Sequence, residues 1–284
     1  MATFYNQATL SYNGNTTTSN ITTGELVEVL SATKTAVQTE YQQDDTLTYV
    51  VNILNSGNTT MTGVTISDNL GAYTLNTLTL VPMDYVVGTV RYYVGGVLQP
   101  TPTVTAGPPL TISGLSVPAK GNVTVIYQAK TNDYAPLAQE SSITNTATIN
   151  ANNIANPITA SATVNAYSEP VLRISKSLTP TTVSENGQLT YTFIVQNYGN
   201  TAADEADALI VSDRFDPILN PITVAFNGTA WTEGTEYTYD ATTGQFVSTA
   251  GIITVPAASY TQDAATGAIS IVPGSATLTI TGTV

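Results

Sequence analysis

The N-terminal segment, residues 1–26, constrains this chain most, because it looks like the last piece of a domain. Apolar and polar residues alternate from Ala8 to Tyr12, which is typical of a half-buried strand. Asn13-Gly14 follows and is a strong signal for a hairpin turn. We therefore predict a β-hairpin over residues 1–26.

A close relative of this hairpin lies inside the chain. The stretch from Asn145 to Asn150, followed by residues 158–165, repeats its pattern, and Asn6 aligns with Asn145. A segment of the same kind follows each copy and ends at Lys34 in one case and at Lys176 in the other. The inner copy closes a domain, whereas the outer copy has no domain in front of it to close.

A longer repeat predicts two domains. Leu47-Thr48-Tyr49 recurs as Leu189-Thr190-Tyr191, and Asn55-Ser56-Gly57-Asn58 recurs as Asn197-Tyr198-Gly199-Asn200 at the same offset. Ser67-Asp68 recurs as Ser212-Asp213 after a short insertion near Asp204. We predict domains over residues 27–168 and 169–284.

Short alternating strands and frequent turns, without helical periodicity, indicate the fold class. We predict an all-β protein of two tandem immunoglobulin-like β-sandwiches preceded by a donor hairpin. The last strand of the second domain, 276–280, corresponds to residues 123–127 of the first. The first domain continues with a hairpin over about residues 143–165 that the second domain lacks.

An open sandwich would expose strand edges and apolar core. We therefore expect the N-terminal hairpin of one subunit to complete the C-terminal domain of the next by strand addition. Such a head-to-tail contact continues as a filament or closes as a ring. The residues expected at this interface are Phe4, Ala8, Leu10, Tyr12, Ile21, Leu278 and Ile280. In the alternative interpretation the hairpin packs on the first domain, and Val284 ends a permuted or truncated one.

Charge and residue inventory exclude several functions. The formal net charge is −13, with only seven Lys and Arg residues, which disfavours nucleic acid and anionic membranes as partners. There is no Cys and no His, so disulfides, thiolate metal sites and the commonest general base are absent. No apolar run approaches the length of a membrane span. We expect a protein that associates with itself and uses no cofactor.

The first residues lack the basic and then apolar character of a secretory signal. We expect either that a leader has been removed or that the protein is assembled without the general export route.

The repeated motifs resemble those of a known family. Lys34, Leu47-Thr48-Tyr49, the Asn-x-Gly stretch at Asn55 and Ser67-Asp68, with their second copies, resemble the DUF11 repeat. This β-sandwich module occurs in bacterial and archaeal surface proteins. Two tandem modules without a leader also resemble the major 29-kDa structural proteins of clostridial spore ribbon appendages. The resemblance implies a fibre subunit on a spore or cell surface, which a mother cell could assemble without export.

One set of residues has the types needed for an isopeptide cross-link. A desolvated Lys amine can attack an Asn amide when a neighbouring carboxyl holds the proton, without Cys, His or metal. In the first domain the set is Lys34, Asp68 and Asn145; in the second it is Lys176, Asp213 and Asn6 of the neighbouring subunit. The alternative is an ordinary Lys–Asp ion pair with an Asn that caps a turn.

Other functions have weaker support. Asp44-Asp45 and the acidic group Asp204-Glu205-Asp207 contain calcium-type ligands without a spaced ligand loop. Trp231, Tyr237 and Tyr239 are candidates for a glycan-binding platform, which would make the protein an adhesin. The chain has no catalytic triad or phosphate loop, so we expect no catalysis on an external substrate.

Overall fold

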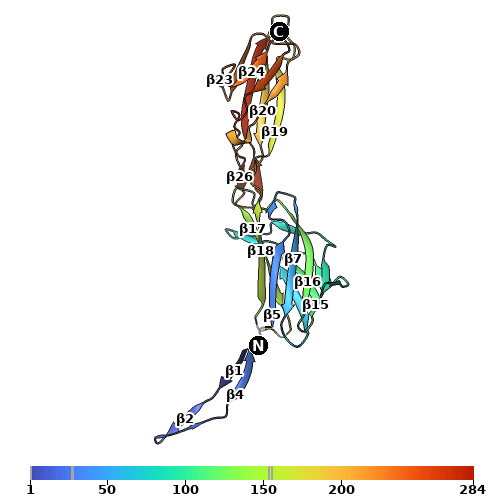
Figure 1. Ribbon diagram of the computed structural model, residues 1–284, viewed down its shortest axis with the longest axis vertical. Coiled ribbons are helices and arrows are strands. Elements are labelled where there is room, and N and C mark those ends of the chain that lie inside the picture. Colours follow the sequence, from blue (N-terminus) through green and yellow to red (C-terminus); the bar gives the residue numbers. More distant parts are fainter. Residues whose placement is uncertain (1, 27–28, 153, 155) are drawn as a thin grey trace. The chain divides into compact units, whose positions relative to one another are not determined.

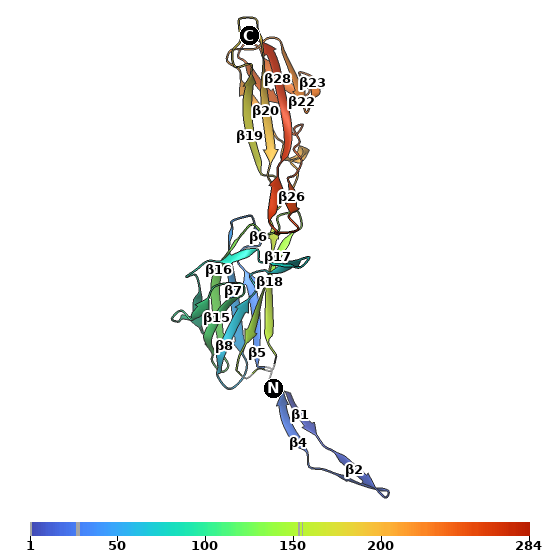
Figure 2. The same cartoon turned by 180° about the vertical axis from the view of Figure 1, so that it is seen from behind.

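A computed structural model describes residues 2–26, 29–152, 154 and 156–284. The chain forms two compact units, residues 1–136 with 142–165 and residues 137–141 with 166–284. Each unit consists of β-strands (Figures 1 and 2), which confirms the predicted all-β class.

The predicted N-terminal hairpin is present as a long two-stranded ribbon (blue in Figure 1). The Asn13-Gly14 turn has both φ angles positive, 46° and 80°, as a tight hairpin turn requires. Phe4 pairs with Gly24 across the ribbon, and its ring fills the space where a side chain of Gly24 would stand. The hairpin strands are β1 (Ala2–Asn6), β2 (Thr9–Tyr12), β3 (Asn15–Thr18) and β4 (Thr22–Leu26).

The hairpin is bonded only to itself among the described residues: β1 pairs with β4, and β2 pairs with β3. Its large apolar side chains are exposed, including Phe4 at 58% and Leu10 at 62%.

The first unit is a sandwich of two sheets with strand orders β13-β12-β16-β7-β5 and β14-β15-β8-β17-β18-β6. The short strand β11 also pairs with β16, and β9 and β10 form a separate two-stranded sheet. The strands are β5 (Leu30–Ala36), β6 (Glu40–Tyr41), β7 (Thr46–Asn55), β8 (Met61–Asp68), β9 (Tyr73–Leu75), β10 (Leu78–Leu80), β11 (Met83–Tyr85), β12 (Arg91–Val94), β13 (Val97–Leu98), β14 (Thr103–Thr105), β15 (Leu110–Val117), β16 (Asn122–Thr131), β17 (Ser142–Asn150) and β18 (Ile158–Ala166).

The core of the first unit follows from the alternation read in the sequence. In β7 the side chains of Leu47, Tyr49, Val51 and Ile53 point inward and are fully buried. β17 contributes its own alternate side chains to the same core, so the internal hairpin β17–β18 is part of the sandwich. Burial on one face is what holds the strand register, because a one-residue slip would turn every apolar side chain outward.

The second unit has sheets of order β19-β20-β28-β22-β23 and β21-β25-β24 and a separate hairpin, β26–β27, that the sequence did not predict. A 3-10 helix, η1 (Glu205–Asp207), occupies the insertion near Asp204. The strands are β19 (Leu172–Thr179), β20 (Gln188–Asn197), β21 (Ser212–Arg214), β22 (Ile222–Phe226), β23 (Thr229–Trp231), β24 (Tyr237–Asp240), β25 (Gln245–Ser248), β26 (Ser259–Gln262), β27 (Ile269–Val272) and β28 (Gly274–Thr283).

One sheet has the same strand arrangement in both units, whereas the other sheet differs between them. In the first unit β8 lies between β15 and β17, and β17–β18 extend the sheet. In the second unit the counterpart of β8 is β21, which pairs with β25 on one side and, within the described residues, with no strand on the other. The second unit thus has an open sheet edge where the first has a hairpin.

In the part of the chain that the structure describes, no helix has the length and apolar character needed to cross a membrane.

Candidate functional site

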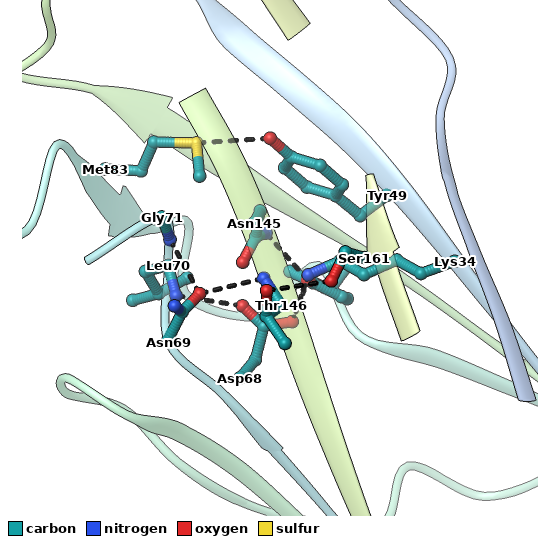
Figure 3. Close-up of polar contacts among 11 residues, drawn as sticks. Lys34, Tyr49, Asp68, Asn69, Leu70, Gly71, Met83, Asn145, Thr146 and Ser161 are labelled. Carbon is teal, nitrogen blue, oxygen red and sulfur yellow. Dashed lines mark hydrogen bonds and ion pairs between the residues drawn. The ribbon is translucent and has the colours of Figure 1, made fainter. Parts of the chain in front are cut away.

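The structure brings Lys34, Asp68 and Asn145 together between the two sheets of the first unit (Figure 3). Lys34 comes from β5 in one sheet, whereas Asp68 and Asn145 come from β8 and β17 in the other. The Nζ atom of Lys34 lies 2.5 Å from Oδ2 of Asp68, and both side chains are completely buried. These three residues are far apart in the sequence and lie on three different strands. They become neighbours because the two sheets pack face to face.

A phenol links this pair to the amide. The Tyr127 hydroxyl donates to Oδ2 of Asp68 at 2.5 Å and accepts from Nδ2 of Asn145 at 3.2 Å. Among the described residues, Oδ1 of Asn145 is buried without a hydrogen-bond partner. An unsatisfied buried oxygen of this kind costs about 1–3 kcal/mol and calls for an explanation. The amide oxygen of Asn145 is therefore ready to accept a proton donor.

Burial sets the protonation chemistry of the site. It lowers the pKa of Lys34 from 10.5 to about 8, against the opposing effect of the Asp68 charge and hydrogen bond. The Lys34 Nζ atom also lies 4.9 Å from the centre of the Tyr49 ring. Burial, and then the Asp68 charge, raises the pKa of Tyr127 well above its usual value, so this phenol keeps its proton. Burial thus makes the Lys34 amine easier to deprotonate than a lysine in water.

The second unit has an equivalent Lys–Asp pair that is partly exposed to solvent. Lys176 and Asp213 form an ion pair, with 39% and 19% of their side chains exposed. The Lys176 Nζ atom lies 4.3 Å from the centre of the Tyr191 ring and 5.6 Å from that of Phe215. Ile280 pairs with Tyr191 as Tyr127 pairs with Tyr49, so an apolar residue stands where the first unit has the bridging phenol.

The second unit has an apolar cleft between β19 and the residues that directly precede β21. Its volume is about 180 Å³, and its lining includes Leu172, Ile174, Val195, Leu209, Val211 and Ile253. Ile174 on β19 is 58% exposed, whereas the inner face of the corresponding strand β5 is covered.

Two residues expected at the assembly interface lie elsewhere. Leu278 and Ile280 are buried in the core of the second unit, where they are 1% and 0% exposed. Their strand, β28, is paired with β20 on one side and β22 on the other, so its backbone has no open edge. The expectation that these residues receive a strand is wrong for this reason, and the open edge is β21. The hairpin residues Phe4, Ala8, Leu10, Tyr12 and Ile21 are all exposed.

The aromatic residues proposed as a glycan platform serve packing instead. Trp231 stacks on Phe226 with ring centres 5.3 Å apart. Tyr237 is 5% exposed, and the Tyr239 hydroxyl donates to the Leu219 carbonyl at 2.7 Å. These three side chains do not present a common exposed face.

The acidic loops also have local roles. Asp44 pairs with Lys130 at 2.7 Å, and the Asp45 carboxylate accepts from the Gln42 amide at 2.8 Å. Asp204 and Asp207 cap η1 reciprocally. The described residues contain no group of three or more His, Cys, Asp and Glu side chains arranged to hold a metal ion.

Sequence reasoning missed the part played by Tyr127. The sequence did contain a signal for this residue. The repeat aligns Tyr127 of the first domain with Ile280 of the second, so the phenol hydroxyl is present in one domain and absent from the other. The repeated Asn-x-Gly motif has a structural use: the Asn55 side chain bonds to the Gly57 amide and the Thr59 carbonyl, and Asn197 bonds likewise to Gly199 and Thr201.

Comparisons with known proteins give weak structural likenesses. No protein-family model matches the chain, so the resemblance to the DUF11 repeat is not confirmed, and no curated protein matches it. Among solved structures, the pilus backbone RrgB of Streptococcus pneumoniae is 14% identical with a TM-score of 0.35, and the match covers 86% of this chain and 55% of that one.

The major pilin BcpA of Bacillus cereus is 12% identical with a TM-score of 0.38, over 96% of this chain and 73% of that one. The major pilin SpaD of Corynebacterium diphtheriae is 12% identical with a TM-score of 0.36, over 78% and 49% respectively. We therefore infer function from the residues of this chain alone.

Proposed function

We propose that this protein is the structural subunit of a fibre on a spore or cell surface, polymerised head-to-tail by exchange of its N-terminal hairpin. The observation that carries the proposal is the complementarity of two parts of one chain. The hairpin exposes its apolar side chains, and the second unit has an apolar cleft and an open edge where the first unit has a hairpin.

The first unit supplies the expected register. There Ala147 lies opposite Asp68, and Ile149 lies opposite Ile66. Ala8 and Leu10 align with Ala147 and Ile149, so in the joint Ala8 lies opposite Asp213 and Leu10 lies opposite Val211. Val211 lines the cleft, and the Leu10 side chain is the group that fills it.

The same register adds main-chain bonds. In the first unit the Asn69 amide donates to the Thr146 carbonyl at 3.0 Å. Arg214 occupies the position of Asn69 and Gln7 that of Thr146, so the Arg214 amide donates to the Gln7 carbonyl of the next copy. Burying each large apolar side chain contributes about 1.5–3 kcal/mol, and several together make a long-lived contact.

We also propose an amide bond between Lys34 and Asn145 within the first unit. The burial of Lys34 beside Asp68 and the unpartnered Asn145 oxygen support it. The Lys34 amine attacks the side-chain carbonyl of Asn145 after its proton passes to Asp68. The C–N bond forms as the amide nitrogen leaves, so that an ammonium ion is released and no other reactant is needed.

Electron microscopy of the full-length protein tests the exchange. We expect filaments from the natural sequence and only monomers from Leu10→Asp, because a carboxylate cannot enter the apolar cleft. Val97→Asp is the matched control, since Val97 is a similarly exposed apolar residue on an edge strand of the first unit. Monomers from the natural sequence, or filaments from Leu10→Asp and from a chain lacking residues 1–26, would overturn the proposal.

A further inference from the structure

The Lys–Asp pair occurs twice in this chain, in two states of solvation. Lys34 and Asp68 are 0% exposed, whereas Lys176 and Asp213 retain 39% and 19% exposure. Both amines lie over the ring of the matching tyrosine, Tyr49 or Tyr191. Besides the replacement of Tyr127 by Ile280, the sites differ in the strand β17, which lies over the first site.

That strand also delivers the amide. In the first unit β17 places Ala147 opposite Asp68, and Asn145, two residues earlier on the same face, reaches the Lys34 site. With Ala8 opposite Asp213, Asn6 stands two residues earlier at the place that Asn145 takes. One docking event therefore excludes water from Lys176 and supplies the group that its amine can attack.

We propose that docking of a second copy's hairpin switches on a covalent joint between Lys176 and Asn6, and that Lys176 is unreactive until then. This inference rests on the proposed hairpin exchange. Before docking, Lys176 is paired with Asp213, remains partly exposed to water, and lacks the amide that the neighbour's hairpin would bring. Covering the pair favours neutral partners, because a low-dielectric site penalises both charges.

The step balances without an outside reactant. The Lys176 ammonium passes a proton to Asp213, and the amine lone pair attacks Cγ of Asn6 while the protonated carboxyl donates to the amide oxygen. The Cγ–Nδ2 bond then breaks, and the nitrogen leaves as ammonia, which takes up the remaining proton as ammonium. Each joint is a new amide, and the two chains together lose the mass of one ammonia molecule.

The joint differs from the first site in one respect that affects its rate. Tyr127 holds the Asn145 amide through its hydroxyl, and Ile280 provides no such group. Asn6 is held only by its own hairpin, so we expect the joint to form more slowly than the internal bond.

Two variants that cannot link by themselves test this inference. Leu10→Asp keeps Lys176 and cannot donate its hairpin; Lys176→Met keeps the hairpin and has no nucleophile. Boiled in denaturant, each alone should run as a monomer. Their mixture should give a covalent dimer and no larger covalent species. The mass of this dimer should be lower than the sum of the two chain masses by one ammonia. Replacing Asn6 by Ala in the donor should abolish this dimer.

The outcomes separate the joint from the exchange. Filaments of the natural protein that dissolve into full monomers on boiling would overturn the covalent joint and leave the exchange intact. Linked species from Leu10→Asp alone would overturn the gating by docking. If the mixture forms no complex even before denaturation, the exchange itself fails, and with it this inference. A dimer that survives in the Asn6→Ala donor would assign the link to other residues.

Discussion

At the scale of single residues, the first unit shows what a sandwich interior does to a lysine. Lys34 has one carboxylate partner and no exposure, and burial lowers its pKa to about 8 in spite of that partner. A buried ion pair of this kind adds little to stability, because the desolvation penalty offsets the attraction. Its value to the protein is chemical if the amine reacts with Asn145.

We predict that the monomeric Leu10→Asp variant is lighter than its sequence mass by one ammonia and that adding Asn145→Ala restores the full sequence mass. The double variant should also be less stable than Leu10→Asp by about 4 kcal/mol, by analogy with a disulfide that closes a long loop. Asn150→Ala in the same background, on the same strand but exposed, is the control and should retain both the bond and the stability. Intact-mass spectrometry and urea unfolding measure the two effects; a full-mass Leu10→Asp protein would refute the bond.

The pH dependence of the unlinked site has a definite sign. In Asn145→Ala, unfolded Lys34 binds a proton up to pH 10.5, whereas native Lys34 releases it near pH 8. The unfolded state holds more protons between these values, so stability rises with pH from about 8. Above about pH 10 the buried Tyr49 and Tyr127, whose pKa values are raised, act in the opposite direction.

Urea midpoints of Asn145→Ala in the monomeric Leu10→Asp background, measured from pH 7 upward, should therefore increase between about pH 8 and 10. The same protein with Lys34→Met added should lose this increase. Equal slopes for the two proteins would mean that Lys34 is not the group responsible.

At the scale of elements, β21 is a strand with one edge whose backbone groups are not paired with another described strand. It pairs only with β25, and its amides that point the other way have no strand partner in the described part of the chain. Native proteins avoid leaving such edges uncovered, because they invite pairing with another chain. We propose that the partner of this edge is the N-terminal hairpin of another copy.

Among the described residues of the monomer, the amide of Arg214 donates only to the carboxylate of its neighbour Asp213, at 2.9 Å. We predict that its hydrogen exchanges at least about tenfold more slowly in filaments than in the Leu10→Asp monomer, because it then donates to a main-chain acceptor on an added strand. Val247 is the internal control, since β25 is paired on both sides and its exchange should not change. Unchanged exchange at Arg214 in filaments would exclude strand addition at β21.

At the scale of the whole molecule, the two units are unequal in completeness. Within the described residues, the first unit has a hairpin beside β8, and no strand lies at the corresponding edge of β21 in the second. The N-terminal hairpin, whose apolar side chains are exposed, is the proposed partner of that edge. An isologous dimer is not the expected assembly, because donor and acceptor surfaces are different.

We predict that the second unit is the less stable one in Leu10→Asp and that a peptide of residues 1–26 raises its unfolding temperature. Trp231, the only tryptophan, lies in the second unit and reports on it by fluorescence. At a peptide concentration about 100 times Kd the gain is about 2.7 kcal/mol. The same peptide with Leu10→Asp should give no shift; equal shifts from both peptides would argue against filling of the cleft.

The sequence predicted the strands best where one face is buried. The alternation in β7 and the Asn13-Gly14 turn led to the elements observed, because a period of two and a turn with positive φ are local properties. The hairpin β26–β27 was missed because it has no counterpart in the first repeat. Leu278 and Ile280 were misassigned because alignment alone does not show which strand is central in a sheet.

The sequence by itself determined the repeat, the unmatched hairpin and the residue types Lys, Asp and Asn at equivalent positions. Those follow from composition and spacing, which need no coordinates. Only the tertiary structure decided that Lys34 is buried with Asp68 and Asn145, that Tyr127 bridges them, and that Lys176 stays half-exposed beside an open edge. Burial is a property of packed sheets, because it depends on which strands cover a side chain, and those strands are distant in the sequence.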